Sequence, residues 1–425
     1  MNIALFLFAY FYAWLGAVAQ LMLVIIAALT LADLLMLFVP KKPIKAERTV
    51  PQRLSNGDNN TIQFSITNHF PISISVEVID EIPHQFQVRD FSLKAALKPG
   101  VTEAFNYDLH PTERGEYDFG SIRVFCASII GFASRRITIP QSATVPVYPS
   151  FIQMRKFEMY AISNRLTDIG VKKIRRIGHT MEFDQIREYV PGNDVRSINW
   201  KATARTGALM VNQYQDERSQ QVVNVIDMGR VMKMPFNGLK LLDYAINTSL
   251  VISNIALLKE DKAGLLTFTN KEITVIKPEK RRTHIQRIQD SLYKLDTNFL
   301  ESNYERLLVG LKTHLNQRSL VLLYTNFETL DAMKRQLPYL QRIARDHLLV
   351  TIFFENTELT SLLHQPSKTV GDIYVKTVAE QFNYEKRQIV KELNQHGIHT
   401  ILTPPKELSV NAINKYLELK ARGMI

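Results

Sequence analysis

Cysteine is almost absent from this 425-residue chain, which contains a single one, Cys126. One cysteine excludes a disulfide within the chain and a zinc site built from several cysteines, and it fits a reducing compartment. The sequence also lacks a Walker A phosphate loop, a His-Glu-x-x-His helix, a Gly-x-Ser-x-Gly turn and a Cys-x-x-Cys pair. Without these signatures we expect neither an enzyme nor a cofactor.

Acidic residues are fewer than basic ones: the sequence has 41 Asp and Glu against 52 Lys and Arg, which gives a formal net charge of +11. Net charge concerns association, so nucleic acid, anionic lipid and acidic proteins are all conceivable partners at this point. Two basic runs, residues 172–176 and 277–282, contain no aromatic residue that would stack on bases. We therefore expect no nucleic-acid partner, and interpret the runs as solvated faces or as contacts with anionic lipid.

Residues 1–40 form an apolar segment in which Asp33 is the only charged side chain between Ile3 and Val39. As one straight helix the segment would exceed a hydrocarbon core of about 30 Å, so it is either one tilted helix or a hairpin turning near residues 14–16. We favour the hairpin. A cleavable signal peptide fits poorly, because the run is too long and no basic segment precedes it.

The basic residues after this segment predict its orientation. They are Lys41, Lys42, Lys45 and Arg48. Basic flanks stay on the cytoplasmic side of a membrane, so the rest of the chain is expected in the cytoplasm.

Residues 41–150 show the period of two that is typical of half-buried antiparallel strands. Ile62, Phe64 and Ile66, for example, alternate with polar residues. Turn signals separate such runs at short intervals, as at residues 55–58, 98–100 and 113–115. We predict a β-sandwich-like module, with structural glycines in the turn at residues 114–120.

Residues 218–425 alternate short apolar runs with longer amphipathic patterns, which is typical of a mostly parallel sheet covered on both faces. The expected strands are Val222–Ile226, Gly264–Phe268, Leu320–Tyr324, Leu348–Phe354 and Ile398–Leu402. Helices are expected near residues 239–250, 304–315, 329–344, 378–395 and 410–420. Doubly wound sheets bind ligands beyond the carboxyl ends of their strands, which directs attention to Asp227–Val231 and to Thr325 with Asn326.

A charged connecting motif lies within residues 151–217, between the two soluble regions. It contains Glu182, Asp184, Arg187, Glu188, Asp194, Arg196, Trp200, Lys201 and Arg205. Opposite charges at this density can fix a loop onto a domain surface through arginine–carboxylate pairs. Trp200 fits a buried clamp and an interface anchor equally well. We favour a structural or partner-binding motif over catalysis by the carboxylates.

Two stretches carry a family resemblance: GHTMEFDQIREYVPGNDVRSINWKATARTGALMVNQYQDE at Gly178–Glu217 and RGEYDFGSIRVFCASIIGFASRR at Arg114–Arg136. Over essentially its whole length the chain resembles the bacterial domain of unknown function 58 family. The resemblance implies a hydrophobic hairpin, a β-rich insert and a von Willebrand factor A-like doubly wound domain. It also implies association with MoxR-type AAA+ ATPases.

A von Willebrand factor A domain that binds Mg²⁺ uses Asp-x-Ser-x-Ser after its first strand, because a hard cation prefers carboxylate and hydroxyl oxygens. The matching positions here are Asp227, Gly229 and Val231, so both hydroxyls are missing. The threonine and aspartate expected from later loops are replaced by Asn303 and Asn326. We therefore expect no metal, and expect Asp227 to cap a turn or helix or to pair with a cation.

These features predict a membrane-anchored, non-enzymatic scaffold or adaptor in the bacterial inner (cytoplasmic) membrane, with its soluble domains facing the cytoplasm. Its expected partners are the lipid bilayer, a MoxR-type AAA+ ATPase and other membrane proteins, in chaperone-like assembly or envelope-related processes. One alternative is a metal-dependent adhesion-type binding module. A weaker alternative is a hydrolase that uses the carboxylates of Glu182, Asp184 and Asp194.

Overall fold

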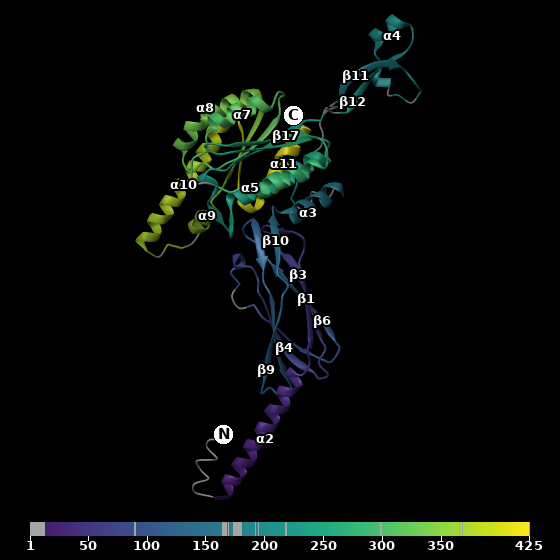
Figure 1. Ribbon diagram of the computed structural model, residues 1–425. Coiled ribbons are helices and arrows are strands. Elements are labelled where there is room, and N and C mark those ends of the chain that lie inside the picture. Colours follow the sequence, from purple (N-terminus) through teal and green to yellow (C-terminus); the bar gives the residue numbers. More distant parts are fainter. Residues whose placement is uncertain are drawn as a thin grey trace. The chain divides into compact units, whose positions relative to one another are not determined.

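The computed structural model describes residues 13–88, 91–163, 168, 170–172, 181–191, 193, 195–216, 219–297, 300–364, 366–367 and 369–424. The chain divides into two compact units, Met1–Tyr148 and Pro149–Ile425. Figure 1 shows a helix and a β-structure in the first, and a helix-covered sheet in the second. The expected connecting segment, residues 151–217, falls within the second unit.

The first unit begins with α2 (Ala13–Phe38), an apolar helix of 26 residues that is largely exposed. Its length is about 39 Å at a rise of 1.5 Å per residue, enough to cross a bilayer core. By length and composition it fits a membrane span or a signal sequence. The turn expected at residues 14–16 is not formed, because these residues already belong to α2. Residues 1–12 lie outside the described residues, so the hairpin stays a prediction.

After α2, the described part of the first unit contains ten short strands and one turn of 3-10 helix, His84–Phe86. The strands are β1 (Ile44–Thr49), β2 (Leu54–Ser55), β3 (Asn60–Asn68), β4 (Ile74–Asp80), β5 (Leu93–Leu97), β6 (Thr102–Leu109), β7 (Gly115–Phe119), β8 (Ile122–Ser128), β9 (Ser134–Ile139) and β10 (Ala143–Tyr148). They form three sheets, with strand orders β1-β3-β6, β5-β4-β8-β9 and β2-β10-β7. The alternating residues Ile62, Phe64 and Ile66 are buried in one shared core, as their period of two predicts.

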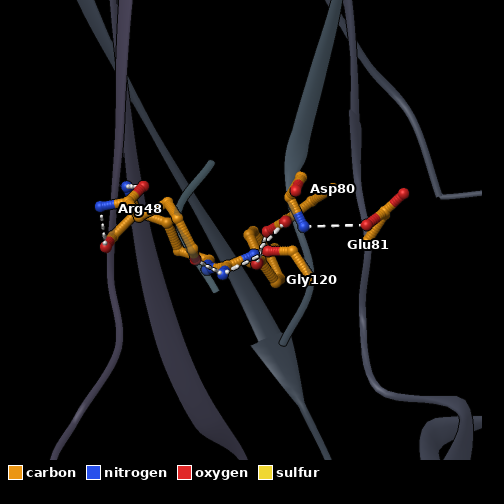
Figure 2. Close-up of polar contacts among 7 residues, drawn as sticks. Arg48, Asp80, Glu81 and Gly120 are labelled. Atoms are coloured by element: carbon orange, nitrogen blue, oxygen red, sulfur yellow. Dashed lines mark hydrogen bonds and ion pairs between the residues drawn. The ribbon is translucent and has the colours of Figure 1, made fainter. Parts of the chain in front are cut away.

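A buried ion pair lies inside this unit (Figure 2). The Arg48 guanidinium contacts the Asp80 carboxylate, and both side chains are almost fully buried. Arg48 Nη2 also donates to the carbonyl of Gly120 at 3.0 Å, and the Tyr107 hydroxyl donates to Asp80 Oδ2. Arg48 therefore is not part of the exposed basic flank, and assigning it there was wrong. Lys41, Lys42 and Lys45 remain exposed.

Gly120 is a structural glycine, as expected. A Cβ atom there would lie 2.3 Å from Glu81 Oε2 and 2.7 Å from Glu81 Cβ, so a larger residue would displace that side chain. Glu81 is itself held in place, because its Oε2 accepts from the backbone N–H of Ser121 at 2.8 Å.

The second unit contains a six-stranded sheet with the order β17-β16-β13-β18-β19-β20. Its strands are β13 (Gln221–Asp227), β16 (Lys262–Phe268), β17 (Ile273–Glu279), β18 (Leu320–Tyr324), β19 (Leu348–Phe354) and β20 (His399–Thr403). All pair in parallel except β17, which is antiparallel to β16 at one edge. The five expected strands are present within one or two residues, and β17 was not expected. The strand order reverses between β13 and β18.

Helices cover both faces of this sheet. They are α3 (Phe151–Ile162), α5 (Leu241–Leu258), α6 (His284–Tyr293), α7 (Tyr304–His314), α8 (Leu330–Asp346), α9 (Thr357–His364), α10 (Val370–Gln395) and α11 (Leu408–Ala421). Val222 and Ile226 of β13 share a core with α5 and α11, whereas Val223 and Val225 share a core with α7, α8 and α10. Helix α5 is as long and apolar as a membrane span, but 89% of it is buried, so it is a core helix.

The remaining elements of the second unit are short. A hairpin of β11 (Met181–Glu188) and β12 (Met210–Asp216) encloses α4 (Trp200–Thr206), and β14 (Pro235–Phe236) pairs with β15 (Leu239–Lys240). The side-chain oxygen of Asn199 accepts from the Ala202 N–H at 3.0 Å and caps α4, and Gly207 (φ 70°) ends it in the left-handed region.

Candidate functional site

The carboxyl edge of the sheet carries a buried carboxylate, Asp227, at the end of β13 and beside the point where the strand order reverses. Its Oδ1 accepts from the Gly229 backbone N–H at 2.8 Å and from the Ser302 hydroxyl. Its Oδ2 accepts from Thr325 Oγ1 at 2.7 Å and lies 3.3 Å from the Tyr304 hydroxyl. We call these five residues the Asp227 cluster. The expectation that Asp227 caps a turn is confirmed by the bond from Gly229.

The hydroxyl protons of the Asp227 cluster can be assigned from its distances. The Thr325 hydroxyl has one proton to donate. Of the two oxygens near Thr325 Oγ1, Asp227 Oδ2 at 2.7 Å is the nearer, so this hydroxyl donates to the carboxylate. The Tyr304 hydroxyl lies 2.8 Å from Thr325 Oγ1 and donates mainly to that oxygen. The carboxylate therefore accepts from Gly229, Ser302 and Thr325, while the Tyr304 hydroxyl is held mainly by Thr325.

Burial raises the pKa of Asp227, while the hydrogen bonds from Ser302, Thr325, Gly229 and Tyr304 act in the opposite direction. Burial and the nearby Asp227 charge raise the pKa of Tyr304 well above its ordinary value. Only 1% of Asp227 is exposed, so a substrate in solution cannot reach it without rearrangement of the cluster. The cluster therefore holds the Asp227 side chain in place and keeps it away from solvent, although burial on balance raises its pKa.

Ser302 occupies the space that a serine at position 229 would need. A Cβ atom on Gly229 would lie 2.4 Å from Ser302 Oγ and 3.1 Å from Asp227 Oδ1. The hydroxyls near Asp227 thus come from Ser302 and Thr325, and not from positions 229 and 231. Val231 packs against the core, and among the described residues no group of three His, Cys, Asp or Glu side chains is placed to hold a metal ion.

Two positions expected from the metal-site pattern have other contacts. The Asn303 side chain accepts from the Arg306 N–H at 3.0 Å and caps α7. The Asn326 side chain accepts from Lys386 Nζ at 2.7 Å. Sequence reasoning missed Ser302, Tyr304 and Lys386, and the one available signal was the run of hydrogen-bonding residues just before α7.

A cavity of about 200 Å³ lies next to the Asp227 cluster, since Asn326 follows Thr325 directly in the chain. Its apolar walls are Met234, Phe236, Leu241, Phe354, Leu359, Phe382 and Pro405. Its polar walls are Asn326, Glu328, Glu355, Asn356, Asn383 and Lys386. Such a site is mostly apolar with a few polar groups, which is the usual character of a ligand or side-chain pocket.

Lys386 is the chemically distinctive group of the cavity. Its Nζ donates to Asn326 Oδ1 and to the carbonyl of Phe327, and lies 5.7 Å from the centre of the Phe353 ring. Burial lowers the pKa of Lys386 to about 8, although Glu328 favours the charged form. The amine is therefore held in position by two acceptors and stays cationic at neutral pH.

The charged connecting motif is only partly described. Asp194 lies outside the described residues, as do the side chains of Glu182 and Asp184. Arg187 Nη2 donates to the Asn193 side chain at 3.0 Å. The exposed members are Arg187, Glu188, Arg196, Trp200, Lys201 and Arg205. Trp200 is 70% exposed, which does not fit a buried residue that clamps two domains together. Its use as an anchor in a protein interface stays a prediction.

Residues 185–362 match the model of the family described as "Protein of unknown function DUF58". The chain is also similar to "Uncharacterized protein YeaD" of Bacillus subtilis (strain 168), with 25% identity over 207 residues. That alignment covers 46% of this chain and 50% of the relative, so the chain spans about half the length of the curated relative it matches. The family match includes the hairpin from Gln185 onward, the Asp227 cluster and β18.

Comparison with solved structures gives only weak likenesses. The conserved hypothetical protein BatB from Bacteroides thetaiotaomicron aligns with a TM-score of 0.30 and 10% identity, covering 48% of this chain and all of that one. The PapD-like domain 7 of human CEP192 aligns with a TM-score of 0.20 and 10% identity, covering 25% of this chain and 85% of that domain. Neither likeness carries an argument about function.

Proposed function

We propose that this chain is a membrane-anchored, non-enzymatic binding protein whose second unit engages a protein partner at the carboxyl edge of its sheet. The observation that carries the proposal is the apolar cavity that contains Lys386. It lies next to the Asp227 cluster, in which the carboxylate is already hydrogen-bonded. A binding site needs an apolar recess and a positioned charge, whereas catalysis needs an accessible acid, base or nucleophile.

The strand order, with an antiparallel edge strand and a reversal beside Asp227, supports a von Willebrand factor A-like domain. In a doubly wound sheet the reversal point is where ligands bind, and the Asp227 cluster and the cavity both lie at that edge. We propose that the cluster fixes the loop after β18, since Thr325 anchors it from one side and Lys386 contacts Asn326 and Phe327. A rigid loop provides a partner with a preformed surface.

The partner that we propose is a MoxR-type AAA+ ATPase, which would supply the energy for a chaperone-like process. An apolar side chain of the partner would fill the cavity, and an acidic group would meet Lys386. We further propose that α2 anchors the chain in the inner membrane with both units in the cytoplasm, as the exposed Lys41, Lys42 and Lys45 favour.

A site-specific photocrosslinker tests this proposal in native membranes. Benzoylphenylalanine would replace Phe382, a 42% exposed cavity residue, or Tyr374, a 72% exposed residue of the same helix that does not line the cavity. We expect the ATPase to be crosslinked from position 382 and not from position 374. Equal crosslinking from both positions, or none from position 382, would contradict binding at the cavity.

A metal-dependent adhesion module stays the alternative, and it would have to bind its ion at Asp227, which now accepts from the hydroxyls of Ser302 and Thr325. A carboxylate with two hydroxyls is a donor set suited to Mg²⁺. Titration calorimetry with Mg²⁺ on the wild type and on Asp227→Asn distinguishes the candidates. Heat that is present in the wild type and lost in the variant would favour the metal-dependent module.

A further inference from the structure

The loop between β8 and β9, residues 129–133, is tied to the apolar helix α2. Asp33 of α2 is fully buried, and its Oδ2 accepts from the backbone N–H groups of Phe132 at 2.9 Å and Ala133 at 2.8 Å. Arg135 Nη1 donates to the carbonyl of Leu37 at 2.7 Å and to that of Pro40 at 2.8 Å. The loop is therefore held beside the last two turns of the helix.

The side chains at the tip of this loop are apolar and exposed. Ile129 is 83% exposed and Phe132 is 52% exposed, although both belong to a protein unit with a well-filled core. On α2 itself Phe38 is 53% exposed, and its ring centre lies 5.4 Å from the guanidinium carbon of Arg135, which follows the loop. Exposed apolar residues on a loop that is bonded to a long apolar helix are typical of contact with a membrane.

The depth of the loop follows from its attachment to Asp33. The candidate span Gly16–Phe38 has 23 residues and a length of about 34 Å, about 4 Å more than a hydrocarbon core of about 30 Å. Asp33 lies five residues, or about 7 Å, before the end of that span. With the span centred, Asp33 and the loop lie about 5 Å inside the boundary of the core, the usual depth of an interfacial insertion.

The polar groups around the loop fit this position. Three backbone N–H groups of the loop are satisfied within the protein, because Ile130 donates to Ser128 Oγ and Phe132 and Ala133 donate to Asp33. These bonds lower the cost of placing this part of the backbone near the membrane interior. Exposed cations that suit anionic headgroups follow both elements: Lys41 and Lys42 after α2, and Arg136 after the loop.

From these contacts we infer that residues 129–132 insert into the same bilayer as α2, at the level where acyl chains meet anionic headgroups. The inference rests on the proposal that α2 is a membrane anchor. It adds a second membrane contact, which would fix how the first unit tilts on the membrane and would keep it from swivelling about the end of a single helix.

Depth-dependent fluorescence quenching tests this inference on the full-length protein. The native Cys126 does not interfere, because its side chain is fully buried and burial raises its pKa to about 12. A single cysteine introduced by Ile129→Cys or Phe132→Cys would carry an environment-sensitive dye. The protein would be reconstituted in vesicles of phosphatidylcholine and phosphatidylglycerol that contain a lipid with a nitroxide on its acyl chain.

Two matched positions provide the controls. Leu35→Cys, at an exposed position of α2, reports on the helix. Asn59→Cys, also exposed, reports on the far end of β3: Asn60 at the start of this strand pairs with Leu109, whereas Asn68 at its other end pairs with Ile44, close to α2 in the chain. We expect both loop positions to be quenched at least half as strongly as position 35, with position 59 unquenched.

Loop positions that behave like position 59 while position 35 is quenched would overturn the inference and leave the anchor in place. An unquenched position 35 would overturn the anchor itself and the inference with it. Using two loop positions guards against a local effect of either substitution, because both must show quenching for the inference to stand.

Discussion

Removing the carboxylate of Asp80 should strongly destabilise the first unit. Asp80→Ala leaves the Arg48 guanidinium buried without its charge partner, and breaking one side of a buried ion pair costs about 3–5 kcal/mol. Arg48 keeps the carbonyls of Gly120 and Gln141, which places the loss near the lower end of this range. The Tyr107 hydroxyl also loses its acceptor, which adds about 1 kcal/mol.

Amide hydrogen exchange followed by mass spectrometry measures this loss locally, in peptides that cover β1, β4 and β8. A loss of about 4 kcal/mol corresponds to exchange that is faster by about three orders of magnitude for amides that require opening of the unit. Arg123→Ala is the matched control, since its pair with Glu81 is 48% and 34% exposed and should contribute less than about 1 kcal/mol. If Asp80→Ala changed exchange no more than Arg123→Ala, the assignment of Arg48 to the buried core would be refuted.

Three further predictions concern the second unit. Gly229→Ser should lower the free energy of unfolding by about 1–3 kcal/mol, because the new side chain clashes with Ser302. Adding Ser302→Gly to that variant should restore most of the lost free energy, as measured by denaturant titration. A Gly229→Ser protein as stable as the wild type would contradict the close contact between positions 229 and 302. The folded protein holds Lys386 with a pKa of about 8 against an ordinary value of 10.5, so the unfolded chain binds more protons between these values and stability should rise with pH across this window. This slope should be reduced in Lys386→Met, and an equal slope in both proteins would refute it. Trp200→Ala should leave the melting temperature unchanged, because the side chain is 70% exposed. The same substitution should remove the crosslinks to the proposed partner ATPase, and retained crosslinks would show that Trp200 is not an anchor of that interface.

The strands of the second unit could be predicted because fully buried parallel strands are continuous apolar runs, as in Leu320–Tyr324. The edge strand β17 (Ile273–Glu279) has no fully buried residue and contains Pro278, so its apolar pattern is weaker. Its antiparallel pairing follows from a short connection after β16, which the apolar pattern alone does not reveal.

The burial of Arg48 was predictable and was missed. Burial alternates strictly along β1, so Ile44, Ala46 and Arg48 share the inward face. The same period places Asp80 inward at the end of β4, in line with Val76 and Val78. Two opposite charges on the inward faces of strands that share one core indicate a buried pair, although β1 and β4 belong to different sheets. The basic-flank interpretation considered only closeness to the apolar N-terminal segment.

The Asp227 cluster could not be assembled from the sequence, since Ser302 and Thr325 follow Asp227 by 75 and 98 residues. The carboxyl-edge rule did direct attention to Asp227 and Thr325, which the structure brings together. It could not identify Ser302, which comes from a loop before a helix, or Lys386, which reaches the edge from the middle of α10. Only the path of these connections in three dimensions brings the side chains together.

The attachment of Asp33 to the β8–β9 loop also has a consequence for the order of synthesis. Asp33 leaves the ribosome 100 residues before Ala133, its backbone partner. At about 5–20 residues per second the carboxylate therefore waits about 5–20 s without the amides that receive it in the folded protein. In the proposed membrane anchor a carboxylate at this depth is costly, so the end of α2 would settle at its final level only when β8 and β9 have formed. The proposed anchoring and the folding of the first unit would thus be completed together.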